Sequence, residues 1–197
     1  MKQKGYIPMM KKISNSFAKW LIENGMPKEQ EQVYSYGLEC LLNEAVITIF
    51  LFLIALFLHK VPEMLVWDIA FTLLRVNLGG VHASTHAKCI LSSTLIGVFS
   101  ILLCPYLYNY FIVFIVAGLI SCVIVFVIAP VKNKNHPISG AREAFARKYS
   151  IIIAVIEYAL ILLLYKHCPA FSSCIFLALF SVSLLGLWGT RNQTKFS

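Results

Sequence analysis

Residues 110–130 read YFIVFIVAGLISCVIVFVIAP, and this stretch decides the fold class. It carries no charge over about 20 residues, which is the length a helix needs to cross the hydrocarbon core of a bilayer. Similar apolar runs lie at 40–59, 89–107, 150–166 and 170–189, and a weaker run at 63–78 contains charged residues. A soluble domain of this length could not bury so many apolar helices, because its surface must be largely polar. We therefore expect an all-α, polytopic integral membrane protein with about six membrane segments.

The composition agrees with this expectation and bears on possible partners. Of the 197 residues, 59% are hydrophobic and 13% are charged, whereas about 25% are charged in an ordinary soluble domain. The net charge of +8 is high enough to raise the question of nucleic-acid binding. However, the basic residues lie in short segments between apolar runs, as in proteins oriented by the positive-inside rule. We expect contact with membrane lipid and no nucleic-acid partner.

The N-terminal region is the main polar part of the chain. Residues 9–24 place Ile13, Phe17 and Trp20 on one helical face, which is typical of an amphipathic helix lying at the membrane interface. We expect a single membrane domain over the whole chain, with three parts: interfacial N-terminal helices at 1–39, membrane segments at 40–189 and a short tail at 190–197. One segment, around 63–88, contains Gly and polar residues and can also be re-entrant.

The distribution of basic residues predicts the orientation. If six segments cross, all of the 17 Lys and Arg residues except Lys60 and Lys166 fall on the side that holds both termini. Cytoplasmic loops are enriched in Lys and Arg. We therefore expect a multi-pass protein of the cell membrane, with both termini, the region around residue 89 and a basic loop at 131–149 on the cytoplasmic side.

The six cysteines do not form the pattern of a disulfide framework, because most of them lie inside apolar runs. A cysteine in such a run usually behaves as a small buried hydrophobic residue. Cys168 and Cys174 flank a short loop and can pair if it faces an oxidising compartment. Only Cys89 has polar, titratable neighbours.

Those neighbours make residues 75–89, RVNLGGVHASTHAKC, the most reactive stretch of the sequence. It combines a thiol, two imidazoles and a cation at a predicted membrane–cytoplasm boundary. A cysteine is nucleophilic as the thiolate, which Lys88 and the positive end of a helix starting near Cys89 would favour. An imidazole could hold the thiolate and later return a proton to a leaving amine.

Spacing alone does not decide which histidine pairs with Cys89. His86 is the nearer neighbour on a continuous helix. His82 lies two turns away, about 10 Å, and reaches the thiol only if the chain between is not a straight helix. Gly79-Gly80 permits such a turn just upstream. A third reading is that both histidines are simply interfacial and the thiol is inert.

The same stretch resembles the AgrB family, the accessory gene regulator protein B membrane endopeptidases of peptide quorum sensing. The resemblance extends over nearly the whole chain. The matching residues are Arg75, Gly79-Gly80, His82-Ala83 and Cys89, then Ala129-Pro130 and Asn135-His136-Pro137-Ile138 downstream, and Tyr36-Gly37-Leu38-Glu39 upstream.

The resemblance implies a thiol protease of a bacterial, Gram-positive cell membrane, with His82 and Cys89 as catalytic residues and His86 in a supporting role. Its substrate would be an AgrD-like precursor peptide, cleaved on its C-terminal side through a Cys acyl-enzyme and cyclised to a thiolactone or lactone autoinducing peptide. We expect no metal and no cofactor. No third catalytic residue or oxyanion-hole donor is evident. The possible supporting residues are Lys88, Arg75, Asn77, Gly79, Gly80, Ser84 and Thr85.

Other features leave alternatives open. Arg142, Arg147 and Lys148 in the basic segment can dock an acidic part of the precursor, or can serve only as a topology signal. We expect a homodimer, because a chain with so few segments has little protein with which to shield its polar groups from lipid. The rival functions are a non-enzymatic membrane exporter of peptides and a structural membrane protein, neither of which needs Cys89.

Overall fold

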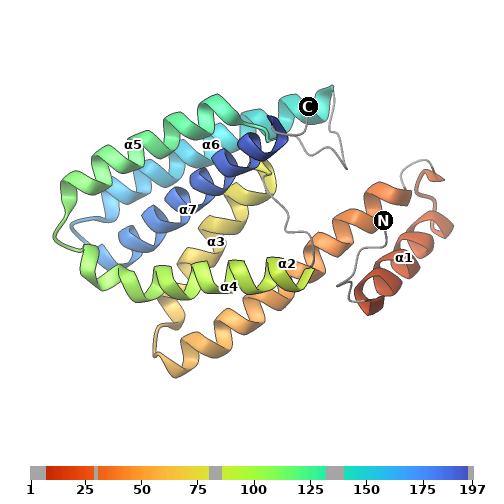
Figure 1. The fold of residues 1–197 in the computed structure, drawn as a ribbon, viewed down its shortest axis with the longest axis horizontal. Coiled ribbons are helices and arrows are strands. Elements are labelled where there is room, and N and C mark those ends of the chain that lie inside the picture. The colour runs from red at the N-terminus through yellow and green to blue at the C-terminus, as the bar shows by residue number, and fades with distance from the viewer. Residues whose placement is uncertain (1–7, 29–30, 80–85, 132–139, 195–197) are drawn as a thin grey trace. The chain divides into compact units, whose positions relative to one another are not determined.

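The computed structural model describes residues 8–28, 31–79, 86–131 and 140–194. This part of the chain is helical, which confirms the predicted all-α fold (Figure 1). Its elements are α1 (Pro8–Glu23), α2 (Glu31–Phe57), α3 (Val61–Leu78), α4 (His86–Leu103), the 3₁₀ helix η2 (Cys104–Leu107), α5 (Phe111–Ile128), α6 (Ala141–Leu164) and α7 (Pro169–Thr194).

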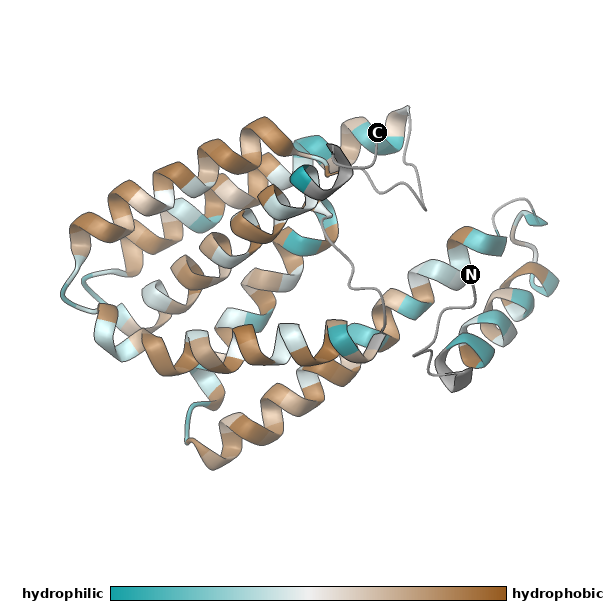
Figure 2. Ribbon diagram, in the orientation of Figure 1, coloured by the Kyte–Doolittle hydropathy of each residue, from teal (hydrophilic) through white to brown (hydrophobic). Residues whose placement is uncertain are grey.

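Four of these helices are long and apolar enough to cross a membrane. They lie at Glu31–Phe57, Ala87–Leu107, Phe111–Ile128 and Pro169–Arg191, and Figure 2 shows how continuous their hydrophobic residues are. Helices α3 and α6 occupy the other two predicted segments, but each contains several charged residues. A polytopic membrane protein is thus supported, and the number of six segments stays a prediction.

One predicted boundary is wrong. The sequence reading assigned residues 131–149 to a basic loop, whereas α6 begins at Ala141. Helix propensity explains the difference, since the segment AREAFARK consists almost entirely of strong helix formers. Gly140, with a φ of 61°, immediately precedes the helix. Arg142, Arg147 and Lys148 therefore lie on the first turns of a helix.

The chain divides into two compact units. The first contains α1, α2 up to Leu53 and the beginning of α4 up to Leu95; the second contains α3, η2, α5, α6, α7 and the remaining ends of α2 and α4. We describe each unit by itself.

Helix α7 forms the centre of the second unit. Within its most apolar stretch of 18 residues, 61% of the residues are buried, whereas 22% are buried in the corresponding stretch of each of the other three candidate spans. Small residues allow its neighbours to approach closely, which is the usual basis of helix packing in membranes. At Gly186 an added Cβ would lie 2.6 Å from the Cδ1 of Ile128 and 3.1 Å from the Cδ2 of Leu78. This glycine therefore lets α7 pack against both α3 and α5.

The second unit has two distinct ends, because α3, α5 and α7 run in one direction and α6 returns (Figure 1). At one end, which we call the Lys60 end, the hydroxyl of Tyr165 donates to the carbonyl of Tyr108 at 2.8 Å. At the other, the Gly79 end, the amide of Val131 donates to the carbonyl of Leu78 at 2.8 Å. Lys60 and Lys166 belong to the first end, and the basic first turns of α6 to the second.

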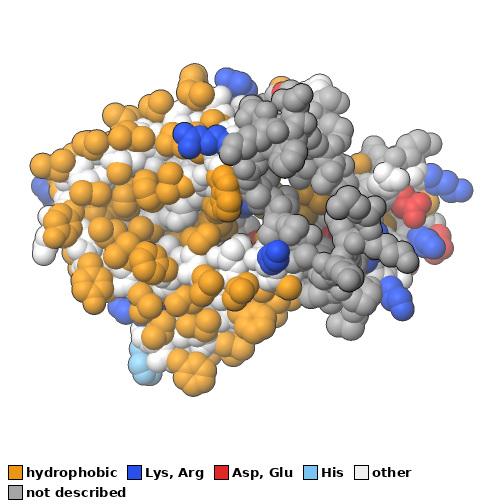
Figure 3. All heavy atoms as spheres, in the orientation of Figure 1, with side chains coloured by type: hydrophobic (Ala, Val, Ile, Leu, Met, Phe, Trp, Pro, Cys, Tyr) orange, Lys and Arg blue, Asp and Glu red, His pale blue; other side chains and the backbone are white. Residues whose placement is uncertain are grey.

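The outer surface of the second unit is apolar. Ile112, Phe126 and Leu163 expose 75%, 57% and 68% of their surface. Figure 3 shows hydrophobic side chains over most of the described part of the face in view. Apolar patches larger than a few hundred Å² are rare on soluble monomers. A lipid environment accounts for this surface.

In the first unit, α1 directs its apolar stripe away from the protein. Ile13, Phe17 and Trp20 are 46%, 45% and 53% exposed, whereas the small residues Ser14 and Ala18 are fully buried. The hydroxyl of Ser35 on α2 donates to the Oδ1 of Asn15 at 2.6 Å and so links the two helices. The outward stripe supports the prediction of an interfacial amphipathic helix.

Candidate functional site

Cys89 lies in the first turn of α4, where the chain enters a candidate membrane span. Its side chain is half-buried and the neighbouring Lys88 is exposed. The first turn of a helix presents unpaired backbone N–H groups and a partial positive charge. Cys89 is therefore a partly exposed thiol in the first turn of a helix that enters a candidate membrane span.

Asn43 of α2 contacts the thiol directly. Its Nδ2 group donates to the Sγ of Cys89 at 3.6 Å, within the range accepted for bonds to sulfur. The side chain is 7% exposed, and its Oδ1 atom is buried with no hydrogen-bond partner among the described residues. A buried amide oxygen without a partner is unfavourable. This oxygen is therefore available to a donor group that enters the site.

Asn43 belongs to a polar row on α2. Tyr36, Cys40 and Asn43 are spaced by four and three residues, so they share one face of the helix. The Cys40 side chain is hydrogen-bonded with Tyr36 and lies close enough to Cys89 to interact with it electrostatically. The row thus brings a hydroxyl, a second thiol and an amide to the side of α2 that meets the start of α4.

Several predicted site residues lie outside the described part of the chain: His82, Gly80, Ser84 and Thr85. His86 begins α4, but its side chain also lies outside the described part. The choice between His82 and His86 therefore stays a prediction.

Arg75, Asn77 and Gly79 make contacts at the C-terminal end of α3, in the second unit. The guanidinium of Arg75 donates to the carbonyl of Gly79 at 3.1 Å, and the amide of Asn77 donates to the carbonyl of Leu73 at 2.9 Å. Gly79 ends α3 with a φ of 77°, a conformation that favours glycine. In these contacts the three residues stabilise the C-terminal end of α3.

Gly79 also joins two of the motifs on which the family resemblance rests. It forms an isolated bridge with Val131, which follows Ala129-Pro130. An added Cβ at Gly79 would lie 3.0 Å from the carbonyl oxygen of Val131. Two motifs that are about 50 residues apart in sequence therefore meet at the Gly79 end of the bundle.

The three predicted docking residues are all exposed. Arg142, Arg147 and Lys148 lie on the first turns of α6, at the Gly79 end. They form a cationic surface that an acidic peptide could approach.

Asn43 is the site residue that the sequence reading missed. The signal was present, since an amide within an apolar segment is unfavourable unless it is bonded. Nothing local connected it with Cys89, which is 46 residues away in sequence.

Comparison with known protein families identifies the chain. The family described as accessory gene regulator B (AgrB) matches residues 10–187. The chain therefore belongs to the AgrB family, as its motifs predicted. Membership implies peptidase activity, with the AgrD precursor of the autoinducing peptide as substrate in quorum sensing. Comparisons with curated proteins and with solved structures give no match.

Proposed function

We propose that the chain is a membrane cysteine endopeptidase that cleaves an AgrD-like precursor through an acyl-enzyme on Cys89 and promotes cyclisation of the peptide. The observation that carries the proposal is the contact between the Asn43 amide and the Cys89 thiol at the start of α4. An exporter or a structural protein has no need of a polar group buried against this sulfur.

In the first half of the reaction, the Cys89 thiolate attacks the carbonyl carbon of the scissile peptide bond. The C–N bond breaks, the acyl group stays on Sγ as a thioester, and the leaving amine takes a proton from the imidazole of His82. The C-terminal part of the precursor departs. A histidine that first accepts the thiol proton and then donates it fits this sequence of steps.

In the second half, a cysteine thiol or serine hydroxyl within the bound peptide attacks the thioester carbon. That nucleophile loses its proton to the imidazole, and the Cys89 thiolate leaves. The product is a cyclic thiolactone or lactone. Transfer between sulfur and sulfur or oxygen keeps the acyl group activated, whereas attack by water would release a linear acid.

Asn43 has a defined role in this scheme. Its Nδ2 group, at 3.6 Å from Sγ, stabilises negative charge on the sulfur before attack and after the acyl group leaves. Its unpartnered Oδ1 atom can accept a hydrogen bond from the imidazole and so orient it. A buried amide that orients a catalytic imidazole is a known arrangement in cysteine proteases.

We also propose that both termini, Cys89 and the first turns of α6 face the cytoplasm. The basic residues of the second unit support this orientation, since Arg142, Arg147 and Lys148 lie at one end and Lys60 and Lys166 at the other. The exposed basic residues of α6 would then meet a precursor made in the cytoplasm. We further propose a homodimer, in which a second copy shields polar groups from lipid.

Mass spectrometry of a co-expressed precursor tests the catalytic proposal. Wild-type protein should release the C-terminal fragment, and Cys89→Ala should release none. Cys168→Ala is the matched control, because Cys168 is an exposed thiol of the second unit, and it should cleave like wild type. Cleavage by Cys89→Ala would exclude the acyl-enzyme and favour the exporter reading.

Labelling of intact cells tests the orientation separately. An impermeant maleimide should label the native Cys168, which lies exposed at the Lys60 end. It should miss a cysteine introduced by Ala141→Cys in a Cys168→Ala background, because Ala141 lies at the Gly79 end. The opposite result would reverse the orientation without affecting the assignment of Cys89.

A further inference from the structure

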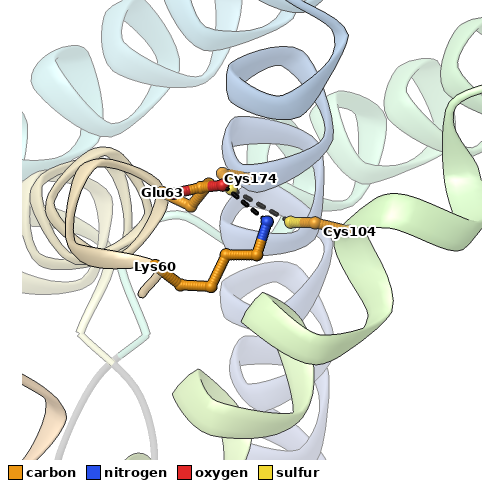
Figure 4. A network of polar contacts seen from close by, with 4 residues as sticks. All are labelled: Lys60, Glu63, Cys104 and Cys174. Carbon is orange, nitrogen blue, oxygen red and sulfur yellow. Dashed lines mark hydrogen bonds and ion pairs between the residues drawn. The ribbon is translucent and has the colours of Figure 1, made fainter. Parts of the chain in front are cut away.

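A second cysteine cluster lies at the Lys60 end of the second unit and includes none of the proposed catalytic residues. The Sγ atoms of Cys104 in η2 and Cys174 in α7 are 3.0 Å apart. The Nζ of Lys60 lies 2.9 Å from the Oε1 of Glu63. Figure 4 shows the lysine ammonium group directed towards the carboxylate and the two thiols. The cluster therefore joins three segments that are distant in sequence.

The pairing differs from the one that the sequence suggested. Cys168 and Cys174 flank a short loop, but the structure places Cys104 beside Cys174 and leaves Cys168 exposed. The reason is tertiary, since η2 packs against the beginning of α7. Cys104 and Cys174 are 1% and 0% exposed. Two buried thiols in contact need to approach by only about 1 Å to reach the length of a disulfide bond.

Lys60 lies beside this buried pair. Its ammonium group interacts electrostatically with both Cys104 and Cys174. The hydrogen bond with Glu63 raises the pKa of Lys60, so the side chain stays cationic over the physiological range. Lys60 is 34% exposed, whereas Cys104 and Cys174 are 1% and 0% exposed, so an oxidant reaches the thiols only when this end of the unit opens.

We propose that Cys104 and Cys174 form a disulfide bond that links η2 to α7 at the outer face of the membrane. The oxidant is a disulfide, either of a small molecule or of a thiol oxidoreductase. One protein thiolate attacks it, which forms a mixed disulfide and releases one thiolate. The second protein thiol, after losing its proton, attacks the mixed disulfide and releases the other. Two electrons pass to the oxidant, and the two protons end on the released thiolates or in solvent.

The location in the cell rests on the orientation proposed above, whereas the chemistry of the pair does not. With the Lys60 end outside, the pair faces an oxidising compartment, where disulfides persist. The experiment is therefore run in two settings, so that a failure of the orientation is distinguishable from a failure of the pairing.

The first setting is purified full-length protein in detergent, treated with excess oxidised dithiothreitol, a cyclic disulfide whose adducts with single thiols reverse, so that only paired thiols stay oxidised. After denaturation, a mass-tagged maleimide should label all six cysteines of reduced protein but only four of oxidised protein. Cys104→Ser should show five labels with and without reduction. Cys168→Ser is the matched control and should still lose two labels on oxidation. Equal labelling before and after reduction of the oxidised wild-type protein would overturn the proposal.

The second setting is intact cells, in which free thiols are blocked by alkylation before lysis. Peptide mapping should then find Cys104 joined to Cys174 in a large fraction of the protein. A pair that forms in detergent but is fully reduced in cells would overturn the outward placement, and with it the disulfide as a feature of the cell.

A lysine variant tests why the pair is reactive. Lys60→Met keeps an unbranched chain but removes the charge, so oxidation in detergent should slow about 3- to 30-fold if the ammonium group stabilises the negative charge on the attacking sulfur. Lys166→Met, which removes the other lysine of this end, is the control and should oxidise at the wild-type rate. Equal rates for Lys60→Met and wild type would exclude the lysine from the proposal.

Discussion

Replacement of Asn43 gives the most direct test of the proposed site, because this residue contacts the sulfur that carries the chemistry. Its Nδ2 lies 3.6 Å from the Sγ of Cys89 and the side chain is 7% exposed. A hydrogen bond to a charged group contributes about 1.5–3 kcal/mol. If the bond is made to the thiolate, Asn43→Ala should slow cleavage about 10- to 150-fold.

Asn43→Asp separates an electrostatic role from a structural one. The substitution keeps the size of the side chain but replaces the donor with a carboxylate beside the sulfur. Two like charges about 4 Å apart repel by up to about 4 kcal/mol at an effective dielectric constant of 20. We therefore expect Asn43→Asp to be at least as slow as Asn43→Ala. A purely structural role predicts the reverse order, since aspartate fills the space that alanine leaves empty.

The assay is the rate at which iodoacetamide alkylates Cys89, followed peptide by peptide over a pH series. In both variants the rate at neutral pH should be lower than in wild type, because the sulfur loses its hydrogen-bond donor. Ser92→Ala is the control: the Ser92 hydroxyl bonds the carbonyl of Cys89 at 3.1 Å and not its thiol. A wild-type pH profile in Asn43→Ala, with wild-type cleavage, would refute the reasoning.

Four further predictions follow from the sequence and the structure. His82→Ala should slow precursor cleavage about 10²- to 10⁴-fold, whereas His86→Ala should keep much of the wild-type cleavage rate. If the two variants show the opposite order on the same precursor, His86 is the base. Reversal of Arg142, Arg147 and Lys148 to Glu should weaken precursor binding most at low salt, because exposed charges are screened over about 8 Å at physiological ionic strength; salt-independent, unchanged affinity would leave the residues as a topology signal. Gly79→Ala should lower the thermal midpoint in detergent by the equivalent of about 1–3 kcal/mol, since its φ is 77° and its Cβ would lie 3.0 Å from the Val131 oxygen. Gly140→Ala should lower it less, because Gly140 has a φ of 61° but its Cβ would have no atom of the described residues within 4 Å. The detergent-solubilised particle should have the protein mass of two chains, and a fully active monomer would reject the homodimer.

The sequence predicted the helices because their signal is local. Apolar runs ended by Gly or Pro place α3 at Val61–Leu78 and α5 at Phe111–Ile128, close to the predicted 63–78 and 110–130. The error at α6 has the same origin: charged residues suggested a loop, although Ala, Arg, Glu and Lys are good helix formers. Charged residues indicate where a segment lies relative to the membrane, and helix propensity indicates its backbone conformation. The two indications differ where a helix extends beyond the bilayer, because such a segment is charged and still helical, as at the start of α6.

The site was predictable only in part, because its contacts join distant segments. The unusual composition around Cys89 singled out that residue. The contact with Asn43 depends on how α2 meets α4, and the contact between Cys104 and Cys174 depends on how η2 meets α7. A single sequence contains no local pattern that specifies either pairing. The polar residue within an apolar run indicates that a partner exists, but not which one.

The two proposed cysteine sites need opposite redox conditions, and α4 is long enough to place them on opposite sides of a membrane. Cys89 must stay reduced to form an acyl-enzyme, whereas Cys104 and Cys174 need an oxidising compartment to form a disulfide. Cys89 lies in the first turn of α4, and Cys104 begins the 3₁₀ helix that directly follows it. The intervening residues span about 22 Å at a rise of 1.5 Å each, most of the hydrocarbon thickness of a bilayer. If both proposals hold, Cys89 faces the cytoplasm, because the reverse orientation would expose the nucleophile to oxidation and keep the pair reduced. The direction predicted from Lys and Arg is therefore the one in which both proposals, the acyl-enzyme on Cys89 and the disulfide between Cys104 and Cys174, can hold.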